Sequence, residues 1–387
     1  MSPSFAFHFE TAPQLWCEPG AALRVGARLR SQGIERAAVI TDAGLVRLGV
    51  IAPLLASLRE AGLETVVFDR VEADPPEALV EEAGAFVAAA DSQAVIGIGG
   101  GSSLDTAKLV ALLARTPQPL TSIYGIGLAK GPRLPLVQIP TTAGTGSEVT
   151  PTSVISTPDH QKKGVIASVL LPDLAVLDAA LTLRLPPAQS AMTGIDAMVH
   201  AIEAYTTRSK KNPLSDVLAR QALDSLDRGL PRVIGNPQDL EAREAMLFGS
   251  MLAGMAFANA PVAAVHALAH PLGTHFHIPH GLANALVLVP VLRFNLAEVA
   301  PLYAELGRAL DAGLLRATDQ QAAGAFIDRM AAHLGASPIP QGLSEVGIAR
   351  EDLPLLAEEA MKVGRLLQNN RREIRYEDAL ALYTSAY

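Results

Sequence analysis

The two halves of the chain carry different hydrophobic patterns, and this change limits the folds open to it. Up to about Asp178, short apolar runs bounded by turn residues alternate with amphipathic stretches of helical length. Such runs are typical of strands that helices cover on both faces. The clearest examples are Ala37–Thr41, Thr65–Phe68, Ala94–Ile98 and Leu136–Ile139. The pattern predicts a parallel α/β sheet of the nucleotide-binding kind.

After Leu185 strand-like alternation almost disappears. Pro186 and Pro187 offer a helix start, and the residues that follow are dominated by Ala, Leu, Glu and Arg at helical spacing. A chain of 387 residues also exceeds the usual length of a single core. We therefore predict an α/β dinucleotide-binding domain over residues 1–183 and an all-helical domain over residues 184–387.

The composition excludes several classes of protein. The formal net charge of −8 argues against a nucleic-acid surface, which needs clustered Lys and Arg. The single cysteine, Cys17, excludes an internal disulfide framework and suits the reducing cytoplasm. Residues 1–13 have no cationic region followed by an apolar stretch, so we expect no signal peptide and a cytoplasmic protein.

One uncharged segment, Ala245 to Val265, is long enough to span a bilayer. Polar and helix-breaking residues interrupt it, among them Asn259 and Pro261, and a group of histidines follows directly. We therefore predict a buried helix followed by a turn, and no membrane contact.

One of the apolar runs is followed by a glycine-rich segment, Gly97-Ile98-Gly99-Gly100-Gly101-Ser102-Ser103-Leu104-Asp105. Consecutive glycines let the backbone approach a ligand closely, and the free N–H groups of the next helical turn form an anion site. The segment therefore indicates phosphate binding, with a pyrophosphate as the natural ligand. The alternative is structural, because Ser102 and Asp105 have the spacing of a capping box and the glycines would then only make a tight turn.

This segment departs from the standard dinucleotide fingerprint, which needs glycine at position 102 and an acidic residue about twenty positions later. The best acidic candidate is Asp42, directly after the run Ala37–Thr41. A carboxylate there accepts from a ribose 2′-hydroxyl and repels a 2′-phosphate, which favours NAD over NADP; the alternative is an ordinary helix N-cap. A second loop, Pro140 to Glu148, adds hydroxyls for phosphate or ribose, although polar turns use the same residues locally.

Histidines gather in one window of the helical half. Five of the nine fall within fifteen residues, and an upstream segment offers Asp196 and His200 four positions apart on one helix face. An Asp with two or three neutral imidazoles binds Fe(II) or Zn(II). Beside a dinucleotide loop, such a metal predicts stabilisation of a substrate oxygen and hydride transfer. Spacing does not choose among the five, which are His266, His270, His275, His277 and His280.

Four motifs follow one another between about residues 35 and 300. They are Gly99-Gly100-Gly101-Ser102-x-x-Asp105-x-x-Lys108, Pro140-Thr141-Thr142-x-Gly144-Thr145-x-Ser147-Glu148-Val149-Thr150, Gly194-x-Asp196-Ala197-x-x-His200-x-x-Glu203, and His266-x-x-x-His270-Pro271-Leu272-Gly273 with Pro279-His280-Gly281. In this order they resemble the iron-containing, or group III, alcohol dehydrogenase family. The resemblance implies a dehydroquinate synthase-like fold, with an α/β nucleotide-binding domain, an all-α domain, and a final helix from Tyr376 to Tyr387.

The resemblance also implies roles for individual residues. It makes Asp196, His200, His266 and His280 the metal ligands, and His270 the unligated catalytic histidine near the nicotinamide. It assigns cofactor binding to Asp42, Gly99, Gly100, Gly101, Ser102, Asp105, Thr141, Thr142, Thr145 and Lys163. Lys163 is matched less directly, because the register around Lys162 and Lys163 is ambiguous.

The implied activity is hydride transfer between NAD(H) and a small alcohol or aldehyde, with Fe(II), or alternatively Zn(II), polarising the substrate oxygen. Maleylacetate reductases, glycerol dehydrogenases and dehydroquinate synthase-like lyases share the fold and stay open, as does a noncatalytic sensor. The family's Asn-Pro-Arg appears here as Asn370-Arg371-Arg372. Pocket positions such as Thr152, Phe257 and Leu366 vary within the family, so the alcohol is not identified. We expect a small-molecule substrate and a homodimer.

Overall fold

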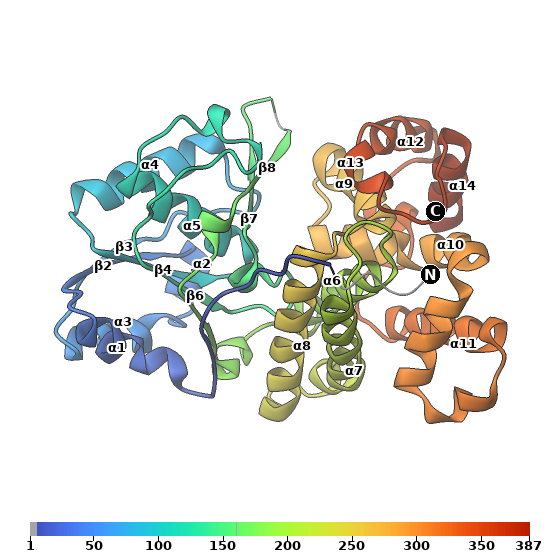
Figure 1. Cartoon of the computed structure of the whole chain (residues 1–387), viewed down its shortest axis with the longest axis horizontal. Coiled ribbons are helices and arrows are strands. Elements are labelled where there is room, and N and C mark those ends of the chain that lie inside the picture. The colour runs from blue at the N-terminus through green and yellow to red at the C-terminus, as the bar shows by residue number, and fades with distance from the viewer. Residues whose placement is uncertain (1–5, 160) are drawn as a thin grey trace. The chain divides into compact units, whose positions relative to one another are not determined.

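The computed structural model describes residues 6–159 and 161–387, which form two compact units (Figure 1). One unit is Glu10–Arg184, and the other is Leu185–Tyr387 together with residues 6–9.

A six-stranded parallel sheet forms the centre of the unit Glu10–Arg184, with the strand order β1-β9-β6-β4-β2-β3. The four apolar runs singled out in the sequence are β2, β3, β4 and β6, so the predicted parallel α/β sheet is confirmed. The bounds are β1 Leu15–Cys17, β2 Arg36–Ile40, β3 Glu64–Phe68, β4 Ala94–Gly99, β6 Leu136–Pro140 and β9 Leu174–Leu177.

Successive residues of the central strands face two different apolar cores. In β2, Ala37 and Val39 pack in a core with α1 and α3, whereas Ala38 and Ile40 pack in a core with α4 and α5. Figure 1 shows these helix pairs on opposite sides of the sheet. Because both faces are covered, the strands read as continuous apolar runs. The helices of this unit are α1 Val25–Ser31, α2 Ala43–Arg47, α3 Ala52–Glu60, α4 Glu77–Ala89 and α5 Gly101–Arg115.

The order of the strands creates a switch point in the sheet. The chain passes from β2 outward to β3, returns to β4 on the other side of β2, and continues to β6 beyond it. The carboxyl ends of these strands are neighbours, since Ile40 pairs with Gly97 and Gly99 pairs with Pro140. Ligands of open α/β sheets bind at such points. Apart from Lys163, the residues predicted to bind the cofactor lie at or after the ends of β2, β4 and β6, so their segments are neighbours.

A small second sheet was not predicted. It has the order β5-β8-β7, with β5 and β8 parallel and β7 and β8 antiparallel. Its strands are short and carry polar residues, which hides them from an apolar-run criterion. They are β5 Gly125–Ile126, β7 Thr152–Ser156 and β8 Lys162–Ile166.

Residues 185–387 contain helices and turns but no strand. Pro187 is the first residue of α6, where its fixed φ and missing N–H are tolerated, and the expected final helix is α14. The helices are α6 Pro187–Thr206, α7 Pro213–Gly235, α8 Leu240–Asn259, α9 Ala264–Phe276, α10 His280–Leu310, α11 Asp319–Gly335, α12 Leu353–Met361, α13 Gly364–Leu367 and α14 Tyr376–Ala386. Short 3-10 helices lie at Ala21–Arg24, Leu120–Ser122, Ser147–Val149, Ser168–Leu170, Ala179–Thr182, Ala312–Arg316, Leu343–Val346 and Arg350–Asp352.

Two apolar stretches of this unit are long enough to be compared with membrane spans. The uncharged segment around residue 250 forms α8, a turn and α9, with a bend of 103° between the two helices, as predicted. Helix α10 passes the length and composition test for a span, and 44% of its most apolar window is buried in the protein. Buried core helices pass the same test, so this is weak evidence for a membrane span.

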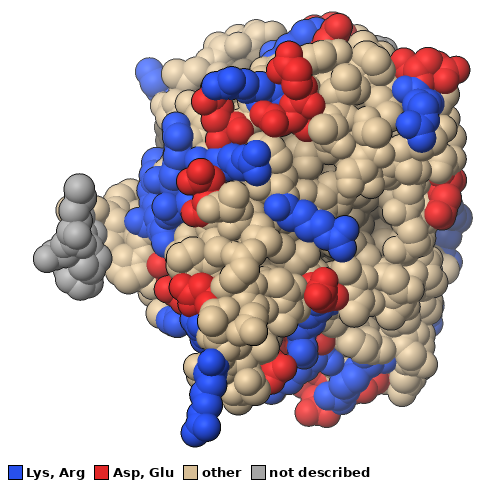
Figure 2. All heavy atoms as spheres, turned by 90° about the vertical axis from the view of Figure 1, so that its right-hand side faces the viewer, with Lys and Arg blue, Asp and Glu red and all other residues tan. Residues whose placement is uncertain are grey.

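One face of the protein is shown in Figure 2, seen from the right-hand side of Figure 1. Basic and acidic side chains are interspersed there among broad uncharged areas. Interspersed charges of both signs are typical of an ordinary solvated surface.

Candidate metal centre and glycine-rich loop

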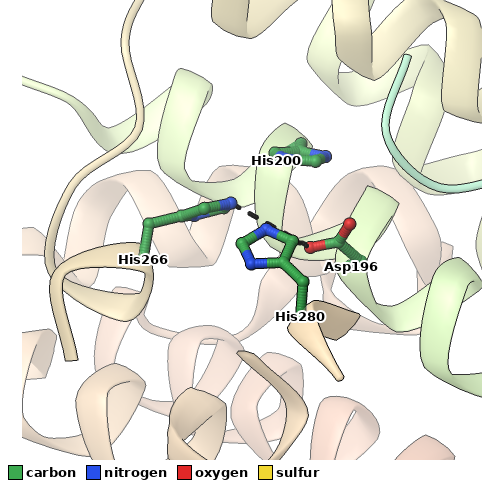
Figure 3. Close-up of side chains that lie close together, drawn as sticks. All are labelled: Asp196, His200, His266 and His280. Atoms are coloured by element: carbon green, nitrogen blue, oxygen red, sulfur yellow. Dashed lines mark ion pairs between the residues drawn. The ribbon is translucent and has the colours of Figure 1, made fainter. Parts of the chain in front are cut away.

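Four side chains of the helical unit converge on one point (Figure 3). Asp196 and His200 come from α6, His266 comes from α9, and His280 is the first residue of α10. Each offers one ligand atom, and these atoms all lie within 4.8 Å of one another. The Oδ1 atom of Asp196 lies 4.0 Å from His266 Nε2 and 3.6 Å from His280 Nε2. Three of the four residues are buried, whereas the His280 side chain is 46% exposed.

Two glycines let the helices that carry these ligands approach closely. A Cβ at Gly194 on α6 would lie 2.5 Å from the end of Met246, so this glycine lets α6 pack against α8. A Cβ at Gly281 would lie 2.4 Å from the carbonyl oxygen of Met192. Helix α10 therefore begins against the backbone of α6, which places His280 beside the ligands of that helix.

The aromatic rings of the cluster pack on one another. The ring centroids of His200 and His266 are 4.8 Å apart with an interplanar angle of 24°, and those of His266 and His280 are 5.4 Å apart. Phe257 covers the other face of His200 at 4.3 Å. Protonated imidazoles would repel one another at this spacing, so the stacking disfavours protonation of all three rings at once. The neutral ring is the form that binds a metal.

A buried amide joins three of the ligand atoms. The Nδ2 atom of Asn284 donates to Asp196 Oδ1 at 2.6 Å and lies 3.3 Å from His266 Nε2 and 3.2 Å from His280 Nε2. The Oδ1 atom of Asn284 is buried without a hydrogen-bond partner among the described residues. The three ligand atoms thus gather around one buried nitrogen. One carboxylate oxygen and imidazole nitrogens fit a divalent transition metal.

Charges in the cluster shift two pKa values in opposite directions. Burial raises the pKa of Asp196, but His200, His280, His266 and a hydrogen bond from Asn284 outweigh this effect and lower it below its ordinary value. Asp196 is therefore held as the carboxylate that a metal ligand must be.

Burial lowers the pKa of His266, but the hydrogen bond with Glu203 and the charges of Glu203 and Asp196 outweigh this effect and raise it. Proton and metal would therefore compete for this imidazole.

The structure separates the five clustered histidines. His266 and His280 lie in the cluster, whereas His275 and His277 are exposed and outside it. His270 is partly buried one turn after His266 on α9, and its Nδ1 lies 3.5 Å from the hydroxyl of Thr274. Its catalytic role stays a prediction.

The glycine-rich segment joins β4 to α5. Gly99 has a φ of 151°, and a Cβ there would lie 2.6 Å from a serine hydroxyl of α5. A Cβ at Gly101 would lie 2.7 Å from Thr145 in the second loop, whereas at Gly100 the nearest side chain, Thr142, is 3.6 Å away. Backbone conformation and packing therefore require Gly99 and Gly101 but leave space at Gly100, where a ligand can approach.

Helix α5 begins without a side-chain cap. Its N-cap is Gly100, with no side-chain hydrogen bond to the first turn. The capping box considered for Ser102 and Asp105 is therefore not formed. The uncapped N–H groups and the positive end of the helix dipole suit an anion such as a pyrophosphate.

The polar side chains that follow the glycines bond within the protein. Asp105 accepts from Ser147 Oγ at 2.5 Å and from the N–H of Val154 at 2.8 Å. Lys108 is buried and donates to Ser147 Oγ at 2.7 Å and to the carbonyl of Thr152 at 2.6 Å. These bonds tie the first loop to the second, and they favour an indirect role for Asp105. Its predicted contact with a cofactor stays a prediction.

Two further cofactor candidates have clear surroundings. Asp42 is the N-cap of α2, and its Oδ1 accepts from the N–H of Leu45 at 3.0 Å. The N-cap role that the sequence left open is therefore filled by one of the two carboxylate oxygens. In β8, Lys162 pairs with Asp74 at 2.7 Å. Because neighbouring strand residues face opposite ways, Lys163 points to the other side. The ribose contacts of Asp42 and Lys163 stay predictions.

The sequence analysis gave no role to two residues that contact the cluster, although one of them, Glu203, stands in a motif quoted above. Glu203, three positions after His200, lies 2.7 Å from His266 Nδ1, and Asn284 lies four positions after His280. The i,i+3 and i,i+4 spacing on a helix is the signal that could have found both.

Comparison with known proteins agrees with this geometry. Residues 12–179 match the family model for iron-containing alcohol dehydrogenase, and residues 190–387 match the model for the C-terminal part of the Fe-containing alcohol dehydrogenase family. The chain is 37% identical over 379 residues to the probable alcohol dehydrogenase EutG of Escherichia coli (strain K12); the match covers 98% of this chain and 94% of that protein.

The chain is also similar to solved structures. One is a 1,3-propanediol oxidoreductase, with a TM-score of 0.95, 33% identity, and coverage of 99% of this chain and 100% of that chain. Another is sulfoacetaldehyde reductase from Bifidobacterium kashiwanohense in complex with NAD+, with a TM-score of 0.88, 26% identity and 98% of each chain covered. The chain belongs to the iron-containing alcohol dehydrogenase family and is an oxidoreductase of that family.

Proposed function

We propose that the protein transfers a hydride between NAD(H) and a small alcohol or its aldehyde. The proposed cofactors are NAD(H) and a divalent metal, Fe(II) or alternatively Zn(II), held by Asp196, His200, His266 and His280. The observation that carries the proposal is the convergence of four ligand atoms within 4.8 Å of one another.

The residues around the cluster suit alcohol oxidation. A divalent cation bound there would lower the pKa of a substrate hydroxyl and polarise a carbonyl oxygen. Asp196 supplies one negative charge, and the ring of Phe257 stacks on His200. His280, whose side chain is 46% exposed, borders the side that a small substrate can reach. His270, one turn from His266, is the proposed acceptor of the substrate's proton, directly or through water.

The α/β unit supports NAD(H) as the redox partner. The amino end of α5 and the backbone around Gly100 are the proposed pyrophosphate site, with the hydroxyls of the neighbouring threonine loop beside it. Asp42 follows β2, the strand next to β4, and would accept from the ribose 2′-hydroxyl and disfavour a 2′-phosphate. Lys163 is the proposed contact to the ribose. The similar sulfoacetaldehyde reductase was solved with NAD+, which supports this choice.

The relatives favour alcohols and aldehydes as substrates. Those reported above are named for alcohol, 1,3-propanediol and sulfoacetaldehyde. Maleylacetate reduction, glycerol oxidation and dehydroquinate synthase-like lyase chemistry are not favoured.

We also propose that residues 1–183 and 184–387 act as two domains of a cytoplasmic homodimer that binds neither nucleic acid nor membrane. The apolar helical half is compatible with a buried dimer face, and the single cysteine suits a reducing compartment. Light scattering after gel filtration tests the assembly, and a mass of one chain would refute the dimer.

The central experiment is anaerobic purification followed by elemental analysis and coupled assays. NAD+ and NADH are tested with short alcohols, diols, aldehydes and maleylacetate, with and without ferrous ion. We expect about one bound metal per chain and metal-dependent net NADH formation from a small alcohol. A lyase would show no net NADH formation, and absence of turnover with every substrate and metal would refute the proposal.

A further inference from the structure

Glu203 is a buried carboxyl group that touches the metal cluster from behind. It lies on α6, one turn beyond His200, and is 4% exposed. Its Oε2 atom lies 2.7 Å from His266 Nδ1 and accepts from the N–H of Ala263 at 2.9 Å. Its Oε1 atom accepts from the N–H of Val265 at 2.6 Å. It is not among the four ligand residues, yet three donors converge on its two oxygens.

Two of these bonds hold the start of the helix that carries His266. The N-cap of α9 is Ala263, whose side chain has no acceptor, and no side-chain cap forms locally. The first N–H groups of a helix have no partner inside it, and burying them without one is destabilising. Glu203 supplies the missing acceptors from a different helix, and its negative charge suits the amino end of α9. It thereby fixes the turn between α8 and α9.

The third bond selects one tautomer of His266. The carboxylate can only accept, so the proton of the neutral ring lies on Nδ1 and Nε2 keeps its lone pair. On the other side of the ring, Nε2 faces the donor Nδ2 of Asn284 at 3.3 Å. The opposite tautomer would set two lone pairs against each other at Glu203 and two N–H groups against each other at Asn284. Both neighbours therefore require the same tautomer.

We propose that Glu203 is a positioning residue that holds His266 in the Nδ1–H tautomer and in one ring orientation, so that Nε2 is ready to bind the cation. This inference rests on the proposed metal-dependent function. Partners of this kind typically change metal affinity by about 10- to 100-fold when they are removed. The carboxylate also adds a second negative charge beside Asp196, so that two carboxylates stand near one divalent cation.

The first test uses the metal-free wild-type protein and needs no turnover. Two-bond ¹H–¹⁵N NMR spectra of histidine-labelled protein distinguish Nδ1–H from Nε2–H rings, and a His266→Gln variant assigns the signal. After the metal is removed by chelation, and at a pH high enough for the ring to be neutral, we expect His266 to be protonated on Nδ1. A neutral His266 protonated on Nε2 would overturn the proposal, and this readout does not depend on any variant of Glu203.

The second test is Glu203→Gln, which replaces one oxygen by an NH2 group. In one amide orientation the NH2 group faces the N–H of Val265 and the oxygen keeps the bond to His266 Nδ1. In the other orientation the NH2 group faces the N–H of Ala263 and donates to His266 Nδ1, which drives the ring proton to Nε2. We expect a population of the Nε2–H tautomer and a Co²⁺ dissociation constant raised by about 10- to 100-fold. Titration of the Co²⁺ absorption bands measures the dissociation constant.

Asp227→Asn is the matched control. Asp227 is a buried carboxylate of α7 in the same unit, and it accepts from Arg329 at 2.5 Å and lies 2.7 Å from His333 on α11. We expect this variant to lose stability while its Co²⁺ dissociation constant stays within about twofold of wild type.

A Co²⁺ dissociation constant of Glu203→Gln within about twofold of wild type overturns the proposal, as does an Nε2–H ring in the metal-free wild-type protein; the wild-type tautomer separates this role from a purely structural one. Failure of the wild-type protein to bind Co²⁺ would instead refute the proposed function, and the tautomer would still decide the role of Glu203.

Discussion

The glycine-rich loop and the metal cluster use their motif residues in opposite ways. In the loop, Asp105 and Lys108 bond within the protein and tie the first loop to the second, so the backbone at Gly100 is left to face a ligand. In the cluster, the side chains of Asp196 and His266 themselves point toward the proposed metal position. Their orientation depends on two buried side chains that contact them, the amide of Asn284 and the carboxyl group of Glu203.

This difference predicts different sensitivities. A site made of backbone N–H groups depends on space and on the conformation of a turn, and individual side chains contribute little binding. A site made of side chains loses a ligand with each substitution. Changes in the two regions should therefore separate NADH affinity from metal affinity.

The largest expected effect is that of His266→Ala. It removes one ligand nitrogen, which should raise the metal dissociation constant by more than about 100-fold, the upper range for changes to outer partners. Metal-dependent NADH formation should be lost. The single tryptophan, Trp16 in β1, reports on the α/β unit, and its fluorescence-detected unfolding should be unchanged. Full activity in this variant would remove the metal cluster from the proposed mechanism.

The free energy of unfolding should depend on pH through Glu148, a residue of the second loop that lies outside the metal cluster. Burial raises the pKa of Glu148 to about 7 from its ordinary value of 4.5, although Lys108 opposes the shift. The unfolded chain therefore releases this proton at lower pH. The contribution of Glu148 to stability is full below about pH 4.5 and is lost as the pH rises to about 7, a change of about 3 kcal/mol.

Glu148→Gln should remove this change. Urea unfolding followed by Trp16 fluorescence at several pH values measures it, with wild type in the same buffers as the control. Equal slopes of stability against pH in wild type and variant would contradict a buried, neutral Glu148.

The space at Gly100 can be tested with a matched pair of alanine variants. In Gly100→Ala the new Cβ would lie at ordinary van der Waals distance from its neighbours, so the protein should fold. The added methyl group should block the approach of the cofactor pyrophosphate to the backbone. We expect the dissociation constant of NADH to rise by about tenfold, or about 1.4 kcal/mol. Gly101→Ala should also disturb Thr145, because the new Cβ would lie 2.7 Å from it. Calorimetry with NADH and with Co²⁺ should show unchanged metal affinity in Gly100→Ala, and unchanged NADH affinity would refute the backbone site.

The smallest expected effect concerns the choice between NAD and NADP. Asp42→Asn keeps an acceptor for the N–H of Leu45 and so keeps the cap of α2, but it removes the charge. We expect the ratio of kcat/KM for NADP to that for NAD to rise by about fivefold, which corresponds to about 1 kcal/mol. Asp42→Ala, which also loses the cap, should be less stable. A ratio that does not change in Asp42→Asn would mean that Asp42 only caps the helix.

Much of the α/β fold could be predicted from the sequence because its central strands are covered on both faces. Consecutive residues such as Val39 and Ile40 face opposite sides of the sheet and are both buried, so the strand reads as one apolar run. The edge strand β1 escaped prediction because only Trp16 of its three residues is partly buried. The strands of the second sheet escaped because they are short and polar, and nothing local marks them as partners.

The site could be predicted only in part, because local sequence does not show which distant residues come together. Helical spacing grouped Asp196 with His200, but the choice of His280 over His275 came from the family resemblance. In physical terms that choice depends on the close contact of Gly281 with the backbone of α6, between residues far apart in the chain. Helical spacing marks Glu203 and Asn284 as neighbours of His200 and His280. Their roles also depend on more distant partners, His266 for Glu203 and Asp196 for Asn284, which spacing alone does not identify.

Anomalous diffraction at the iron absorption edge, from crystals loaded with Fe(II) without oxygen, tests the central claim most directly. The account predicts one strong peak within bonding distance of a ligand atom of each of Asp196, His200, His266 and His280. A fully loaded crystal with the iron bound elsewhere, or with any of these four side chains out of coordinating reach, would contradict it.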